Sequence, residues 1–168
     1  MKKILSIFIF LLLLVGCSLS NTPTAQVEDL LSKYQMLDDD IQEGIDDVVE
    51  SENLTSEQQE RYRKLIEKQY KNLSYEVKDE EIDGDTATIT VEIEVMDYKK
   101  IVNETNETYQ GRTDYKVEEY NDTKLDNLES AKDKVTYTID FEVLKDDDGN
   151  WKISTLTNDM IKKIQGMY

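Results

Sequence analysis

The chain has 168 residues with 37 Asp or Glu, 20 Lys or Arg and no His, giving a formal net charge of −17 at pH 7. One cysteine without histidine excludes a His/Cys zinc site, a Ser-His or Cys-His nucleophile pair and an intrachain disulfide. So acidic a surface is repelled by nucleic-acid phosphates and anionic lipid headgroups. We expect no nucleic-acid partner, no metal and no cofactor.

The first residues have the composition of an export signal. Lys2 and Lys3 supply positive charge, and residues 4–14 form an apolar run interrupted only by Ser6. This run is shorter than the roughly 20 residues that a lasting membrane-spanning helix needs. It fits the apolar region of a secretory signal. We therefore predict that residues 1–16 are a signal peptide.

The residues Leu14-Val15-Gly16-Cys17 resemble the lipobox of bacterial lipoproteins, in which small or apolar residues precede a required cysteine. The resemblance implies that the Cys17 sulfur receives a diacylglycerol and that the signal is cut before it. Because two or more acyl chains anchor a protein stably, the chain would be held on the extracytoplasmic face of the cell membrane. The alternatives are an ordinary cleaved signal, or an uncleaved anchor with an incidental cysteine.

The rest of the chain divides into a tether and one domain. Residues 17–23 are mostly small and polar and contain the only proline, Pro23, so we predict that they form a spacer. Residues 24–168 are long enough for a single domain with a sizeable core. Without a disulfide or a His/Cys metal site, packing must stabilise this domain.

Two helices are predicted at the start of the domain. Apolar residues recur at three- and four-residue steps from Val27 to Val49. This spacing predicts one long helix that starts near Thr24 and can bend near Gly44. The sequence Thr55-Ser56-Glu57-Gln58 is a capping box, which predicts a second helix of about 17 residues.

The pattern then changes from helical to alternating. Apolar and polar residues alternate over 73–78, 87–95 and 135–143, and Asp83-Gly84 suits a tight turn after the first strand. Residues 146–150 predict another turn, and Trp151 and Ile153 begin a fourth strand. Strand 87–95 has a Thr/Glu face opposite its apolar face, so we expect the sheet to cover the core on one side only.

Residues 103–121 have little pattern and predict a long loop, running into a short helix between Tyr115 and Lys132. A loop of this length is a reasonable place for function, although a solvated insertion is the simpler interpretation. Residues 158–165 predict a short helix that Gly166 ends. The fold class is therefore α+β, with two N-terminal helices packed on a bent antiparallel sheet of about four strands and a short C-terminal helix.

This order of elements, with the late Asp-Asp-Gly-Asn-Trp-Lys-Ile hairpin at 147–153, resembles the nuclear transport factor 2-like domain. The resemblance implies a cone-shaped fold that encloses a pocket between helices and sheet, an arrangement common in extracytoplasmic lipoproteins of Gram-positive bacteria. The chain departs from that family in having only about four clear strands and a final helix. A smaller cystatin-like arrangement therefore stays open.

The resemblance also raises the question of catalysis, because some members of the family are isomerases or dehydratases that pair an Asp or His base with a tyrosine. Here the alternation places Asp140 and Glu142 on the outer face of the sheet and no carboxylate on the inner face. A carboxylate beside Tyr137 would favour an enzyme. The candidate pocket-lining residues, which the same spacing also fits as core residues, are Tyr34, Tyr62, Tyr137, Phe141 and Trp151.

We therefore predict a membrane-anchored surface lipoprotein whose acidic domain is a non-catalytic ligand- or protein-binding module. A small-molecule enzyme and a structural accessory subunit of an envelope complex are the alternatives. We also expect a monomer, because pairing through the outer sheet face would oppose like charges. The acidic residues on that face are Glu92, Glu94, Asp140 and Glu142.

Overall fold

The computed structural model of the protein describes residues 21–168. The predicted signal peptide 1–16 and Cys17 therefore lie outside the described residues. The described chain contains six helices and one four-stranded antiparallel sheet, which confirms the α+β class. The elements are α1 (Pro23–Met36), α2 (Asp39–Ser51), α3 (Ser56–Lys71), β1 (Ser74–Asp83), β2 (Thr86–Met96), α4 (Tyr98–Tyr109), α5 (Val117–Glu129), β3 (Lys134–Lys145), β4 (Trp151–Ile153) and α6 (Asn158–Gln165).

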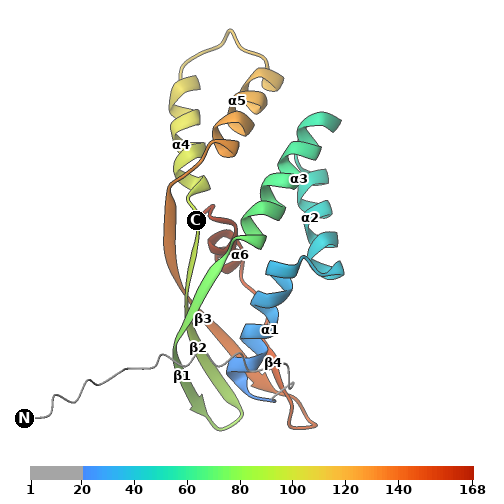
Figure 1. The fold of residues 1–168 in the computed structure, drawn as a ribbon, viewed down its shortest axis with the longest axis vertical. Helices are drawn as coiled ribbons and strands as arrows, with labels where there is room; N and C mark the ends of the chain where they lie inside the picture. Colours follow the sequence, from blue (N-terminus) through green and yellow to red (C-terminus); the bar gives the residue numbers. More distant parts are fainter. Residues whose placement is uncertain (1–20) are drawn as a thin grey trace, which may run out of the picture.

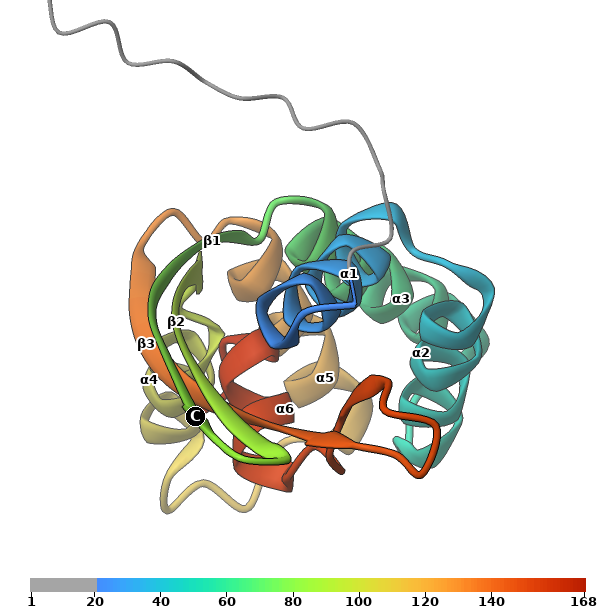
Figure 2. The same ribbon diagram turned by 90° about the horizontal axis from the view of Figure 1, so that it is seen from below.

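The sheet follows chain order, β1-β2-β3-β4. Its centre is the pair β2 and β3, which stay in register from Thr86 opposite Leu144 to Met96 opposite Lys134. The sheet curves around α1 and α6, which cover its inner face (Figures 1 and 2). On the outer face the β3 side chains are exposed, as the alternation predicts.

The main core lies between this inner face and the helices α1, α2, α3 and α6. Strand β2 alternates strictly between buried and half-exposed residues along its apolar stretch, because successive side chains point to opposite faces. Val27 and Leu31 of α1 reach the same core and are fully buried. The inward residues of β2 are Ala87, Ile89, Val91, Ile93 and Val95.

The single long helix predicted from Thr24 to Val49 is wrong, because the chain breaks between α1 and α2. Leu37 takes the left-handed conformation at φ 53°, which ends α1. The Asp38 side chain then accepts a hydrogen bond from the Ile41 amide at 3.0 Å and caps α2. Gly44, where the sequence allows a bend, lies inside the continuous helix α2.

The loop predicted over 103–121 is wrong for its first part, because α4 continues to Tyr109. Helices α4 and α5 form a hairpin inserted between β2 and β3, at one end of the molecule (Figure 1). The Asp97 amide donates to the Asp133 carbonyl oxygen at 2.9 Å and closes the base of this insertion. A second, smaller core joins the insertion to α3 through Leu65, Tyr98, Leu125 and Leu128. Helix α5 confirms the short helix predicted between Tyr115 and Lys132.

The folded part of the chain starts before residue 24. Pro23 is the first residue of α1, and the Thr22 side chain accepts a hydrogen bond from the Ala25 amide at 3.2 Å. Asn21 binds the turn between β3 and β4, since its Oδ1 accepts from the Trp151 amide at 2.8 Å. The last residues of the predicted 17–23 tether are therefore attached to the domain.

Candidate functional site

The five aromatic residues predicted to line a pocket all belong to the main core or pack against it. Tyr34, Phe141 and Trp151 are buried, whereas Tyr62 and Tyr137 are partly buried. Tyr34 packs edge-to-face on Tyr70 with 4.9 Å between ring centroids. These contacts are those of core packing, in which aromatic rings meet edge-on inside a close-packed interior.

Tyr62 also lines a small cavity beneath α3, and Gln165 and Met167 line the same cavity. The cavity has a volume of about 20 Å³, which is room for one water and not for a metabolite. Burial, the main cause, raises the pKa of Tyr62 and of Tyr98 each to about 12. The two phenols therefore stay neutral at physiological pH.

A carboxylate does lie near Tyr137, but it comes from the connection to α4 rather than from the sheet. Burial first, and then the charge of Asp97, raise the pKa of Tyr137. The Tyr137 hydroxyl donates to the Tyr168 carbonyl oxygen at 3.2 Å, and the two rings meet edge-to-face at 5.8 Å. Asp97 and Tyr137 line an open surface depression together with Lys99 and Lys100.

Three tyrosines come together where α4 and α5 meet, with Tyr109 buried and Tyr115 and Tyr120 half-buried. We call Tyr109, Arg112, Tyr115 and Tyr120 the aromatic tip. The Tyr109 ring lies 4.7 Å from that of Tyr115 and 5.3 Å from that of Tyr120, both edge-to-face. The Arg112 guanidinium carbon lies 4.8 Å from the Tyr109 centroid, at cation–π distance.

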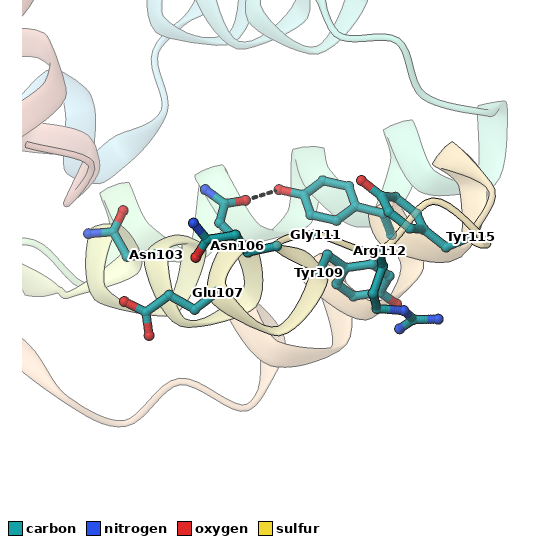
Figure 3. A pocket seen from close by; sticks show the side chains of 9 residues that line it. Asn103, Asn106, Glu107, Tyr109, Gly111, Arg112 and Tyr115 are labelled. Carbon is teal, nitrogen blue, oxygen red and sulfur yellow. Dashed lines mark hydrogen bonds between the residues drawn. The ribbon is translucent and has the colours of Figure 1, made fainter.

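Hydrogen bonds across the hairpin fix the aromatic tip. The Tyr120 hydroxyl donates to Asn106 Oδ1 at 2.5 Å, shown by the dashed line in Figure 3. The Tyr109 hydroxyl and the Thr123 hydroxyl are 2.8 Å apart. Each bond joins α4 to α5, so the tip is built from both helices and is not a free loop.

An open depression of about 640 Å³ follows the aromatic tip along α4 (Figure 3). Its wall combines tyrosine rings with side-chain amides, the Glu107 carboxylate and the Arg112 guanidinium. Arg112 is paired with Asp114 at 3.4 Å and with Glu119 at 3.7 Å, so its charge is offset locally. The arrangement offers apolar rings beside hydrogen-bond donors and acceptors, as a recognition surface does.

A comparison of the chain with known protein families, curated proteins and solved structures gave no match. Within residues 21–168, no group of three or more acidic or cysteine side chains is placed to hold a metal ion. In the same range, no helix has the length and apolar character needed to cross a membrane. The function of the site therefore has to be inferred from its own geometry.

The sequence pattern did not identify the aromatic tip. All four of its residues fall in the segment 103–121 that the sequence predicts as a loop, and its tyrosines share no apolar stripe there. The only signal was the placement of a long unpatterned segment between two strands, which is a common position for binding residues. The tyrosines come together only because α4 and α5 fold back on each other.

Proposed function

We propose that the protein is a lipid-anchored surface protein of a bacterial envelope, and that its domain is a non-catalytic module that binds another protein through the aromatic tip. The anchoring part rests on the lipobox-like residues Leu14 to Cys17. The binding part rests on the position and chemistry of the aromatic tip. A nuclear transport factor 2-like origin of the domain stays a prediction.

The observation that carries the proposal is the distance between the tip and the point of attachment. Asn21, the first described residue, is bound to the β3–β4 turn at one end of the molecule. The loop between α4 and α5 lies at the opposite end along the longest axis (Figure 1). A chain anchored at Cys17 would therefore present the aromatic tip away from the membrane.

The chemistry of the tip favours a protein partner. Tyrosine and arginine are enriched where protein interfaces gain most of their affinity, because they combine large contact areas with directed hydrogen bonds. The stacking of Arg112 and the bonds of Tyr109 and Tyr120 order these side chains in advance, which lowers the entropy lost on binding. Exposed carboxylates flank the tip at Glu107, which lines the depression, and at Glu119, which pairs with Arg112 at 3.7 Å, so a partner with a basic rim fits it best.

Site-specific photo-crosslinking in cells tests the proposal. A photoreactive phenylalanine analogue replaces Thr113, which is exposed in the loop of the tip, and in a matched control it replaces Thr138 on the outer sheet face. We expect one adduct of defined mass from position 113 and not from position 138. The double variant Arg112→Ala/Tyr115→Ala should lose this adduct while keeping its far-UV circular dichroism spectrum. Equal adducts from both positions, or none from position 113, would contradict the proposal.

One observation favours the enzyme alternative, namely the proximity of Asp97 and Tyr137. Both residues line an open depression rather than a closed pocket, and Asp97 already caps α4 through the Lys100 amide at 2.9 Å. Native mass spectrometry separates the two functions. A bound small molecule that leaves on denaturation, and that the Asp97→Asn variant no longer retains, would favour the enzyme.

A further inference from the structure

A row of side-chain amides runs along α4 towards the aromatic tip. Asn103, Asn106 and Gln110 follow one another at steps of three and four residues, so they lie on one side of the helix and its end. All three line the depression beside the tip (Figure 3). We call them the amide row. At 1.5 Å per residue the row is roughly 10 Å long.

The amide row can bind a peptide backbone. Asn103 and Gln110 are exposed, and each amide can both donate and accept hydrogen bonds. Asn106 is more restricted, because its Oδ1 already accepts from the Tyr120 hydroxyl. That bond fixes the orientation of the Asn106 amide and leaves its Nδ2 to donate. The row therefore presents several donors to a ligand that brings acceptors.

Apolar ring surface continues the amide row. Tyr115 and Tyr120 line the same depression, with ring centroids 6.3 Å apart and planes inclined by 43°. Both side chains are half-buried, so part of each ring is accessible. The depression thus joins hydrogen-bonding amides at one end to aromatic rings at the other.

The charge near the depression is negative. Glu107 lines it and is exposed. Arg112 also lines it, but Asp114 and Glu119 pair with this guanidinium. Even with the exposed Lys116 of the same loop included, these five side chains carry three negative and two positive charges. A cationic group is therefore favoured beside Glu107.

These features distinguish among the usual ways of binding a peptide. Residues of α4, the loop after it and α5 line the depression, so it offers no strand edge for β-strand addition. A helical partner needs an apolar groove, whereas the amide row is polar. An acidic or phosphorylated motif needs a cluster of arginines, and Arg112 is the one cation among the lining residues.

A polyproline II segment fits what is left. Its backbone has no internal hydrogen bonds, so its carbonyl oxygens are free to accept from side-chain amides. One turn of three residues at 3.1 Å per residue is about 9 Å long, which is close to the length of the amide row. Proline-rich segments also pack on aromatic-lined grooves, and their stiffness lowers the entropy lost on binding.

We infer that the partner presents a proline-rich segment with a lysine or arginine to this depression, in the polyproline II conformation. Backbone carbonyl oxygens of the segment accept from the amide row, and prolines pack on Tyr115 and Tyr120. The basic side chain pairs with Glu107. The inference rests on the proposed function, because it specifies which part of a protein partner contacts the aromatic tip.

Selection from displayed random peptides tests the inference without assuming a sequence. The immobilised protein is the chain that begins at residue 17 with Cys17→Ser, and peptides that also bind its Arg112→Ala/Tyr115→Ala variant are discarded. We expect the remaining sequences to share two prolines three residues apart and a lysine or arginine. Enrichment of acidic or amphipathic-helical sequences, or of no sequence that depends on the tip, would overturn the inference.

A charge swap tests the role of Glu107. Glu107→Lys should weaken binding of a selected synthetic peptide about fivefold in calorimetry, and a peptide with glutamate in place of its basic residue should recover the loss. Glu104→Lys is the matched control, because Glu104 is exposed on the same helix but does not line this depression. Equal losses in the two variants, or no recovery, would contradict the pairing.

The prolines are tested in the same peptide. Replacing them with alanine removes the stiffness of the segment and should weaken binding at least about fivefold. Unchanged affinity would show that the polyproline II conformation is not what the depression recognises.

The crosslinking experiment separates failure of the inference from failure of the proposed function. An adduct at position 113 together with tip-dependent peptides that lack proline would overturn the inference and leave the proposed function intact. No adduct at position 113 would contradict the proposed function, whereas the selection still reports which peptide chemistry the depression binds.

Discussion

Gly166 ends α6 at a place where a larger residue has no room. Its φ is +69°, and a Cβ would overlap the Met96 carbonyl oxygen and lie 2.5 Å from Gln69 Nε2. Gln69 is 2% exposed and uses its whole amide, since Nε2 donates to the Met96 and Gln165 carbonyl oxygens and Oε1 accepts from the Met96 amide. The junction of α3, β2 and α6 thus depends on the absence of a side chain at position 166.

Gly166→Ala should therefore lower the free energy of unfolding by about 2–4 kcal/mol, from left-handed strain together with displacement of Gln69. Gly44→Ala is the matched control, because Gly44 lies in α2 and a Cβ there would have no other atom within 4 Å. That substitution should raise the free energy of unfolding by about 0.5–1 kcal/mol, since alanine favours helix. Urea unfolding measures both, and similar changes in the two variants would contradict this account.

Because several tyrosines are buried, the free energy of unfolding depends on pH in the alkaline range. Burial, the first cause in each case, raises the pKa of Tyr34, Tyr62 and Tyr98 to about 12, whereas a tyrosine in an unfolded chain ionises near pH 10. The unfolded chain therefore loses protons first. The stability that these groups contribute is complete below about pH 10 and is lost as the pH rises towards 12.

Thermal unfolding followed by circular dichroism should show a midpoint that falls between pH 10 and 12, with absorbance at the wavelength of tyrosinate rising as the chain unfolds. Tyr98→Phe should make this fall shallower, and Tyr168→Phe, at an exposed position, should not. If the unfolding midpoint falls equally in Tyr98→Phe and in the parent protein, ionisation of Tyr98 does not contribute to the pH dependence of stability.

At the scale of elements, alternation and capping predicted the strands and α3, whereas helix α4 and the break between α1 and α2 were not predicted. Helix α4 was missed because its buried side includes Thr105, a polar residue that bonds the Ile101 carbonyl oxygen at 2.8 Å and accepts from Asn127. Thr105 is buried only because α5 packs against α4. Periodicity within one segment does not predict such a contact with another helix. The break at Leu37 was not predicted because the helical apolar spacing continues through it. The only local sign of a new helix is Asp38, which caps α2.

A β-bulge explains why alternation in β1 stops after Val77. Val77 faces Val91 and Asp79 faces Thr90, so Lys78 is an extra residue in the ladder. Beyond it, Glu80 shares the inner face with Ile89, where its carboxylate reaches the first turn of α1. A carboxylate next to a helix N-terminus interacts favourably with the helix dipole. The bulge therefore places Glu80 where it stabilises the start of α1.

The α4–α5 hairpin should be separable from the rest of the fold, because the Asp97–Asp133 hydrogen bond already closes the β2–β3 ladder. Replacing residues 98–132 with Asn-Gly would leave a two-residue hairpin turn and the main core intact. We expect cooperative unfolding at a lower temperature, because Leu65 of α3 becomes exposed. Loss of a cooperative transition would show that the two cores fold as one unit.

At the scale of the whole molecule, the register of the sheet explains why the outer face can be acidic and still stable. Between β2 and β3 each acidic residue lies opposite a threonine, whereas between β1 and β2 Glu76 faces Glu92 directly and Lys78 pairs with both carboxylates. Lys78 and Lys134 offset part of the charge through Glu92 at 2.8 Å and Glu94 at 2.7 Å. The cross-strand pairs are Thr88–Glu142, Thr90–Asp140, Glu92–Thr138 and Glu94–Thr136.

Pairing of two such faces would oppose their carboxylates, so the monomer expected from the sequence stays our prediction. Static light scattering of the soluble Cys17→Ser chain without residues 1–16 should give the mass of one copy at low and at high salt. A dimer mass that grows as salt screens the charges would contradict it, and would identify charge as the only barrier to association.

The proposed lipid anchor rests on the sequence alone, because residues 14–17 lie outside the described residues. Mass spectrometry of the protein extracted from membranes of the producing bacterium therefore tests the central claim most directly. We predict a chain that begins at Cys17 with a diacylglycerol on its sulfur, and release of the Cys17→Ser variant from the membrane. A chain that retains residues 1–16, or begins elsewhere without lipid, would contradict the account.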